Sequence, residues 1–333
     1  MITALLALAF ASLVHAQNES ISWNFGSFIR PKNHSVEFDI RFVSPTTPGQ
    51  YPVIFFLTGL DGLAPGFAYV DFITKLSIET KTIIVSFDSL RFPSIPNKEE
   101  KMFLTSLEWT LENLPAFFNN KKTPEQIKDK VFPSVEDASL MAHSASGHTV
   151  VSYLNETCGK MKALILLDPV DGYDPFGFLK IYITNPPQQL PFVMPTLLIR
   201  TGLDNVPANP LFPACAPDKV SNKRFYDSLP GPSWFLNFTQ YGHAGILDDY
   251  LRKVASLICK VCENDCEFEL YRKSVVTAIG LFYKGINFKS EKFLEALENP
   301  EKSGFFDPKI QIKSVSKSNG YNVLNTGPFC KHQ

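Results

Sequence analysis

A serine flanked by small residues is the first feature of the sequence that could carry out chemistry. Ser144 ends a short apolar run, and small residues stand two positions before it and two positions after it, at Ala142 and Ser146. A nucleophile on a sharp turn between a strand and a helix needs small neighbours there, because larger side chains would collide with the turn. Glycine usually occupies both positions, and a serine that caps a helix gives a similar pattern. The segment alone leaves both interpretations open.

A serine nucleophile needs a histidine that accepts its proton. His243 lies five residues after the last strong strand pattern, in a loop where glycine could let the imidazole return over the sheet. His143 precedes Ser144 in the strand and is expected to point the opposite way, and His148 begins the next helix and is expected to be a packed or hydrogen-bonded core residue. The other histidines lie near the chain ends or before the predicted sheet. Position and elimination therefore favour His243 as the base.

Two carboxylates compete for the role of orienting that histidine. Asp168 follows the apolar run 163–167, Asp204 follows the run 196–200, and Asp171 is a weaker third candidate. The chain order serine, acid, histidine is met by each of them. Spacing alone does not choose between Asp168 and Asp204.

The charge that develops on an attacked carbonyl oxygen needs two backbone N–H donors. Ala145, directly after the serine, is expected to supply one of them. Leu60, in the turn after the apolar run 51–57, is expected to supply the other. The His-Gly pair usual at this turn is replaced by Thr58-Gly59.

Strand patterns and helix patterns alternate through most of the chain. The strand patterns cover residues 35–43, 51–57, 82–87, the run before Ser144, 163–167, 196–200 and 234–238. The helix patterns cover residues 67–79, 101–119, 147–154, 273–284 and 290–297. This alternation predicts an α/β fold with a mostly parallel central sheet flanked by helices. Ligands bind such sheets at the carboxyl ends of the strands, where Ser144 is expected.

The first sixteen residues predict a secretory signal peptide. Residues 2–14 are almost wholly apolar, and Val14-His15-Ala16 resembles a small-residue cleavage site. The segment is too short to span a bilayer, and no other segment is long and apolar enough. We expect a secreted, extracellular protein with no stable membrane insertion, in which residues 17–333 form one domain.

Sequons and cysteines agree with secretion. Four asparagines stand in glycosylation sequons, Asn18, Asn33, Asn155 and Asn237. The six cysteines are an even set, as an oxidising compartment favours: Cys158, Cys215, Cys259, Cys262, Cys266 and Cys330. Three of them cluster between residues 259 and 266, and no histidine lies near the cluster in sequence, so we expect disulfides and no metal site. The formal net charge is -1 and no basic stripe appears, so nucleic acid is not an expected partner.

Three ordered motifs carry a resemblance to a known family. Residues 167–172 read LDPVDG, residues 209–217 end in CAP, and Tyr241-Gly242-His243 is followed by Leu247-Asp248-Asp249. Together they resemble the chlorophyllase family of α/β-hydrolases, over roughly residues 35–300. The resemblance implies an α/β-hydrolase fold without a cofactor. It places the nucleophile on Ser144, the acid on Asp168 and the base on His243. It favours Asp168 because the family generally has no aspartate at the position of Asp204.

The resemblance implies hydrolysis of a carboxylic ester, as in cleavage of the phytyl ester of chlorophyll. The family's serine motif is GHSRGG, whereas residues 142–147 read AHSASG and lack the arginine. The N-terminal signal of residues 1–16 is also typical of secretion and not of import into chloroplasts. We therefore expect a secreted esterase that acts on a small hydrophobic ester, with Phe176, Phe178 and Tyr182 in the wall of an apolar pocket. The alternatives are a catalytically silent secreted binding protein on the same fold, or a lipase or general carboxylesterase with no activity on chlorophyll.

Overall fold

The structure is a computed structural model that describes residues 23–28, 38–60, 62, 64–88, 96–118, 131–157, 161–172, 181–318 and 329–330. Several predictions fall outside these residues. They are the signal peptide, the sequons at Asn18 and Asn33, the bonding of Cys158, and the positions of Phe176 and Phe178.

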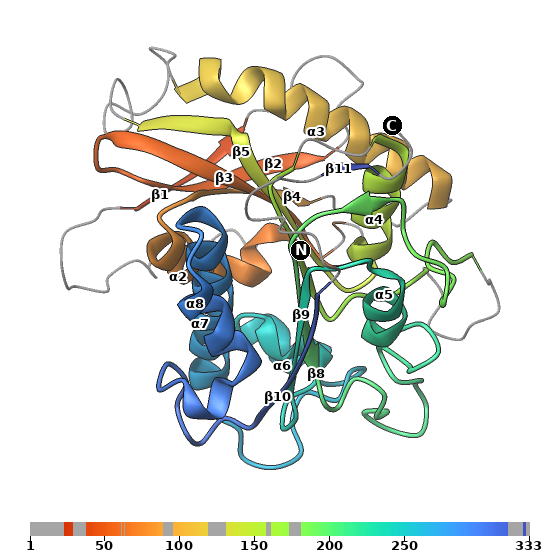
Figure 1. The fold of residues 1–333 in the computed structure, drawn as a ribbon. Helices are drawn as coiled ribbons and strands as arrows, with labels where there is room; N and C mark the ends of the chain where they lie inside the picture. The colour runs from red at the N-terminus through yellow and green to blue at the C-terminus, as the bar shows by residue number, and fades with distance from the viewer. Residues whose placement is uncertain are drawn as a thin grey trace.

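A nine-stranded sheet forms the centre of the described structure (Figure 1), in the order β1-β2-β4-β3-β5-β6-β8-β9-β10. Its strands are β1 (Trp23–Phe28), β2 (Asp39–Pro45), β3 (Gly49–Leu57), β4 (Ile83–Asp88), β5 (Val131–His143), β6 (Leu164–Leu167), β8 (Thr196–Thr201), β9 (Ser233–Phe238) and β10 (Ile312–Lys317). The six strands from β4 to β9 run parallel, and β1, β2 and β10 add antiparallel edges. The short strands β7 (Phe192–Val193) and β11 (Phe329–Cys330) pair separately.

Helices cover both faces of this sheet (Figure 1). One face packs against α2 (Val70–Thr80), α7 (Phe268–Asn287) and α8 (Glu291–Glu298). The other packs against α3 (Pro96–Phe118), α4 (Ser146–Thr157) and α5 (Asn222–Ser228). The central strands are apolar on both faces, since their side chains alternate between the two cores: Ile54 and Phe56 enter one, and Val53 and Phe55 enter the other.

The connections between these elements carry four further short helices. They are η2 (Gly66–Tyr69), η3 (His243–Ile246), α6 (Asp249–Ala255) and η4 (Pro300–Lys302). None of the helices in the described part of the chain is both long and apolar enough to cross a membrane.

The predicted mostly parallel sheet with flanking helices is confirmed, and its edges are corrected. β10 was not expected, because IKSVSK is a largely exposed edge strand without a continuous apolar face. β5 begins at Val131, inside a stretch expected to be a polar connection, because its first half carries exposed charges beside β3. The helices α5 and α6 were also missed, since each has only seven residues.

Disulfides join two pairs of cysteines near the carboxyl edge of the sheet. Cys215 bonds to Cys259, and Cys262 bonds to Cys266. Cys330 is also disulfide-bonded. The expectation that the cysteine cluster forms disulfides is confirmed for all three of its members, and the sequence had left their partners open.

Candidate active site

Ser144 occupies a strained turn between β5 and α4. Its φ of 60° lies in the left-handed region, which a non-glycine residue adopts only when its surroundings hold it there. The Ser144 N–H donates to the Leu167 carbonyl at 3.0 Å, and the Val170 N–H donates to the Ser144 carbonyl at 2.9 Å. A Cβ at Gly147 would lie 2.6 Å from Pro169 Cβ, so the helix after the serine needs glycine there. This geometry is that of a nucleophile elbow, not of a simple helix cap.

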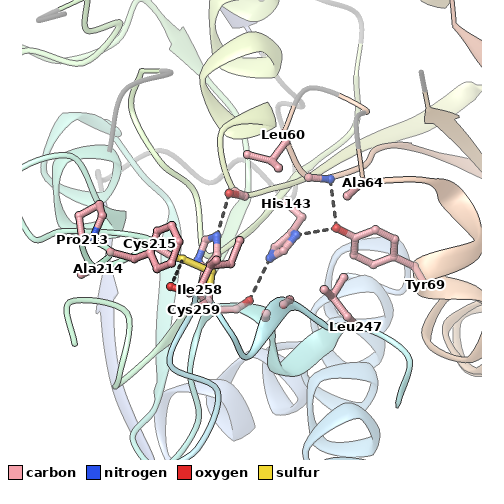
Figure 2. A pocket seen from close by; sticks show the side chains of 16 residues that line it. Leu60, Ala64, Tyr69, His143, Pro213, Ala214, Cys215, Leu247, Ile258 and Cys259 are labelled. Carbon is pink, nitrogen blue, oxygen red and sulfur yellow. Dashed lines mark hydrogen bonds between the residues drawn. A yellow bond between two sulfur atoms is a disulfide. The ribbon is translucent and has the colours of Figure 1, made fainter. Parts of the chain in front are cut away.

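His243 lies directly against this serine. Its Nε2 is 2.7 Å from Ser144 Oγ, and both side chains are buried (Figure 2). Burial lowers the pKa of His243, and the carboxylate of Asp168 opposes that shift. A neutral imidazole with its proton on Nδ1 accepts the serine hydroxyl proton at Nε2, as a general base requires.

The loop that carries His243 is tied to the segment after α6. The Gly242 N–H donates to the Val261 carbonyl at 3.0 Å, and Tyr241 forms a β-bridge with Cys262. A Cβ on Gly242 would lie only 2.0 Å from the Lys260 carbonyl oxygen, so this close approach requires glycine. Because the disulfides of Cys259 and Cys262 lie in the same segment, they restrain the loop that presents the base.

Both candidate acids reach the site. Asp204 Oδ1 lies 3.7 Å from His243 Nδ1, and one carboxyl oxygen of Asp168 lies within 4.8 Å of a His243 ring nitrogen. Within the described residues, no acceptor lies within hydrogen-bond distance of His243 Nδ1. Thr201 joins the two acids, because its Oγ1 contacts both carboxyl groups. The structure therefore places both aspartates behind the histidine. Asp171 is not part of this group, since its Oδ1 lies 3.0 Å from His148 Nδ1.

The prediction for His143 was wrong. Instead of pointing away from the site, it lines the same cavity as Ser144, and its ring stacks on His243 with centroids 5.1 Å apart. Its Nε2 donates to the His243 carbonyl at 3.2 Å, so its Nδ1 accepts from the Tyr69 hydroxyl at 2.7 Å. It is the last residue of β5 and pairs with Leu167 of β6, and the left-handed turn at Ser144 begins directly after it. His148 is buried and hydrogen-bonded, as expected.

Three of these groups have the spacing of metal ligands. One atom each of His143, Asp168 and His243 lies within 4.8 Å of the others. The donor set does not fit a metal, because His143 uses both ring nitrogens for Tyr69 and the His243 carbonyl, and His243 uses Nε2 for Ser144. The arrangement suits proton transfer.

Leu60 and Ala145 present two backbone N–H groups near the serine. Leu60 has a φ of 55°, in the left-handed region, and lies beside the cavity with Ser144 (Figure 2). Among the described residues, neither N–H group donates a hydrogen bond to a protein acceptor. The Leu60 turn is held to the elbow by the Ser146 hydroxyl, which donates to the Thr58 carbonyl. Free donors on two fixed turns are what an oxyanion hole needs.

The turn before Leu60 depends on Tyr69. The Gly59 N–H donates to the Tyr69 hydroxyl at 3.1 Å, and that hydroxyl donates to His143 (Figure 2). A Cβ on Gly59 would lie 2.8 Å from His143 Nδ1 and 2.9 Å from the Tyr69 oxygen. One chain of hydrogen bonds therefore joins the turn of Leu60 to the loop of His243. Tyr69 could not be predicted as a site residue, because in the sequence it is one more residue of the helix pattern 67–79.

A cavity of about 370 Å³ opens beside Ser144 (Figure 2). Its walls are mainly apolar and come from three segments: Gly59, Leu60 and Ala64; Phe212, Pro213, Ala214 and Cys215; and Leu247, Ala255, Ile258 and Cys259. Tyr182 was expected in this wall and is not there. It packs against Val170, Ala216 and Val220 under the guanidinium of Arg224. The wall residues 212–215 belong to the motif that ends in CAP, to which we had assigned no role.

Two predicted sequons lie in the described structure. Asn155 is in the last turns of α4, and Asn237 is in β9 between Arg200 of β8 and Lys313 of β10. Both side chains are half-buried.

Comparisons with known proteins agree with this site. The family model described as Chlorophyllase matches residues 19–303. Chlorophyllase-2 of Arabidopsis thaliana is 28% identical over 260 residues, which cover 72% of this chain and 75% of that protein. Chlorophyllase-1 of Arabidopsis thaliana is 23% identical over 232 residues, covering 66% of this chain and 68% of that protein.

Among solved structures, a thermostable esterase from Pseudomonas putida ECU1011 aligns with a TM-score of 0.38 and 16% identity, over 60% of this chain and 69% of that one. The family match extends over most of the chain and includes the elbow, both aspartates and the histidine loop. The chain belongs to the chlorophyllase family and is a carboxylic ester hydrolase with the α/β-hydrolase fold.

Proposed function

We propose that this protein is a secreted serine esterase that cleaves a hydrophobic ester, with Ser144 as nucleophile, His243 as base and Asp168 as acid. The observation that carries the proposal is the 2.7 Å contact between Ser144 Oγ and His243 Nε2 on a strained turn. A serine placed there for structure alone would not need a left-handed backbone or a buried imidazole within reach.

The reaction follows from the positions of these groups. His243 takes the proton of Ser144 as Oγ attacks the ester carbonyl, and the N–H groups of Leu60 and Ala145 bind the oxygen that becomes negative. The imidazolium then gives its proton to the leaving alcohol, and an acyl group remains on Oγ. Water, activated by the same imidazole, attacks that acyl group and releases the acid and the free serine.

The cavity supports a hydrophobic substrate. Apolar residues from three segments surround the serine, and further apolar side chains stand exposed on the same segments, with Leu211 87% exposed and Leu257 68% exposed. The two Arabidopsis relatives are named chlorophyllases. This chain differs from the family's serine motif at Ala142, Ala145 and Ser146, all within two residues of the nucleophile. We therefore propose a lipid-like ester other than chlorophyll as the physiological substrate.

Secretion is the second part of the proposal. The apolar residues 2–14, the cleavage pattern before Gln17 and the sequons support it. Two disulfides among the described residues agree with an oxidising compartment. Expression in secretory cells tests it: the medium should contain a chain that begins near Gln17 and loses mass on deglycosylation. Retention of the full chain in the cytosol would contradict this part.

A substrate panel tests the activity. Wild-type protein should hydrolyse p-nitrophenyl esters of graded chain length, and chlorophyll is included to decide the substrate class. Ser144→Ala should abolish turnover without loss of folding. Ser228→Ala is the matched control, because this buried hydroxyl in α5 has no hydrogen-bond partner in the described structure and should be dispensable. Turnover that persists in Ser144→Ala would refute the mechanism.

The sequence also allowed a catalytically silent binding protein on the same fold. It would fold identically and bind hydrophobic esters unchanged. The intact contact between Ser144 and His243 favours the enzyme.

A further inference from the structure

Two buried aspartates lie behind His243 where one is sufficient for a catalytic triad. Asp168 directly follows β6 and Asp204 follows β8, and the side chains of both are almost completely buried. The question is what the second carboxyl group does.

Hydrogen-bond donors can be counted around the pair. Asp168 Oδ1 accepts the Thr201 N–H at 2.6 Å, and Asp204 Oδ2 accepts an Asn222 Nδ2–H at 2.7 Å. The two remaining oxygens both face one atom: Thr201 Oγ1 lies 3.0 Å from Asp168 Oδ2 and 2.5 Å from Asp204 Oδ1.

The Thr201 hydroxyl has only one hydrogen. It donates to one carboxylate, and the other carboxyl group must then supply the hydrogen for the second contact. Two ionised carboxylates would instead direct lone pairs and like charges at each other inside the protein. The geometry therefore requires a proton on one of the two acids.

From this geometry we infer that Asp168 and Asp204 share one proton and act together, with a single negative charge, as the acid that orients His243. This inference rests on the proposed function. Asp204 is then a positioning residue, and either carboxylate can face the imidazolium that forms when His243 takes the proton of Ser144.

The charged surroundings agree with one negative charge. Arg200 Nε lies 3.9 Å from Asp204 Oδ2, and the other titratable neighbours are His243, His143 and Tyr271. Burial and the neighbouring Asp204 raise the pKa of Asp168 well above its usual range, and burial raises the pKa of Asp204 to about 6. Both shifts agree with a pair that holds one proton near neutral pH.

Asparagine imitates a protonated aspartate, which makes the inference testable. In Asp168→Asn or Asp204→Asn, the new amide can donate where the shared proton stood, and the other residue remains a carboxylate. Each single variant should therefore keep kcat/KM within about tenfold of wild type. The double variant has no carboxylate, and loss of the orienting acid costs about 10⁴-fold in related triads.

Two results would overturn the inference. A single variant as inactive as the double variant would mean that one aspartate alone is the acid, and a fully active double variant would mean that neither is. Ser144→Ala is assayed beside them. If that variant retains turnover, the proposed mechanism has failed, and the pH dependence of unfolding then decides whether the pair shares a proton.

A second measurement needs no catalysis. The folded protein keeps one proton on the pair at pH values where aspartates of the unfolded chain are already ionised. The pair therefore makes the free energy of unfolding of the wild-type protein fall as pH rises. Urea unfolding between pH 5 and 9 should show a weaker fall in both single variants, because the remaining carboxylate has no proton to share. Unchanged pH dependence in both folded variants would also overturn the inference.

Discussion

Removing the hydroxyl group of Tyr69 tests how the two halves of the site are held together. In Tyr69→Phe the ring still fills its buried position, but the Gly59 N–H loses its acceptor at 3.1 Å and His143 Nδ1 loses its donor at 2.7 Å. A typical buried hydrogen bond contributes about 1 kcal/mol, and a buried group left unpaired costs about 1–3 kcal/mol. We expect the free energy of unfolding to fall by about 2–4 kcal/mol.

The same substitution should lower turnover. The Gly59 turn carries the Leu60 N–H, and His143 holds the carbonyl of His243, so both the oxyanion site and the base lose a support. Loss of a whole oxyanion donor costs about 10²–10³-fold in kcat, and a displaced donor should cost less, about tenfold. KM should change little, because Tyr69 contributes only part of the cavity wall.

The assays are urea unfolding and steady-state hydrolysis of a soluble ester. Tyr226→Phe is the matched control, because the Tyr226 ring stacks on Phe235 away from the cavity. A fall in unfolding free energy below about 0.5 kcal/mol with unchanged kcat would refute the proposed role of Tyr69.

Two further predictions concern stability. Replacing Cys215 and Cys259 by serine opens a disulfide that spans 44 residues and should lower the free energy of unfolding by about 4 kcal/mol. Replacing Cys262 and Cys266, which are 4 residues apart, should lower it by about 2 kcal/mol. Urea unfolding of the two double variants should show this order. An equal loss in the two variants would contradict the chain-entropy argument. Burial raises the pKa of Asp248 to about 7, so its proton stabilises the fold at low pH and this contribution is lost as pH rises toward 7. Asp248→Asn should flatten that part of the stability profile, and an identical profile in the variant would show that Asp248 does not titrate there.

Much of the central fold could be read from the sequence. Parallel strands buried on both faces leave continuous apolar runs, and β3, β4, β6 and β8 were all found in this way. The edge strand β10 was missed because an exposed edge needs no such run. The short helix α6 was missed because seven residues give too little periodicity.

In the candidate site, too, residues with a local sequence signal could be predicted and the others could not. Ser144 and His243 could be predicted because the elbow pattern and the loop after β9 are local signals. His143 was placed wrongly, because the left-handed backbone of Ser144, which brings the side chains of both residues to one cavity, cannot be read from a strand pattern. The relation between Asp168 and Asp204 depends on Thr201, which lies on a different strand from Asp168, and no local pattern reports it.

The residues of the pocket wall could not be predicted from local sequence patterns either. Tyr182 lies soon after the acid in sequence, which suggested that it lines the pocket, but it packs in a separate small cluster. The observed wall comes from residues 212–215 and from the segment near Cys259, which a disulfide brings together from 44 residues apart.

Covalent labelling of Ser144 tests the central claim most directly. Folded wild-type protein is treated with a fluorophosphonate, and the site of attachment is read by mass spectrometry of its peptides. The contact between Ser144 and His243 predicts one adduct on Ser144, absent in Ser144→Ala and strongly slowed in His243→Ala. A folded wild-type protein that stays unlabelled, or that is labelled at another residue, would contradict the assignment of Ser144 as an active nucleophile.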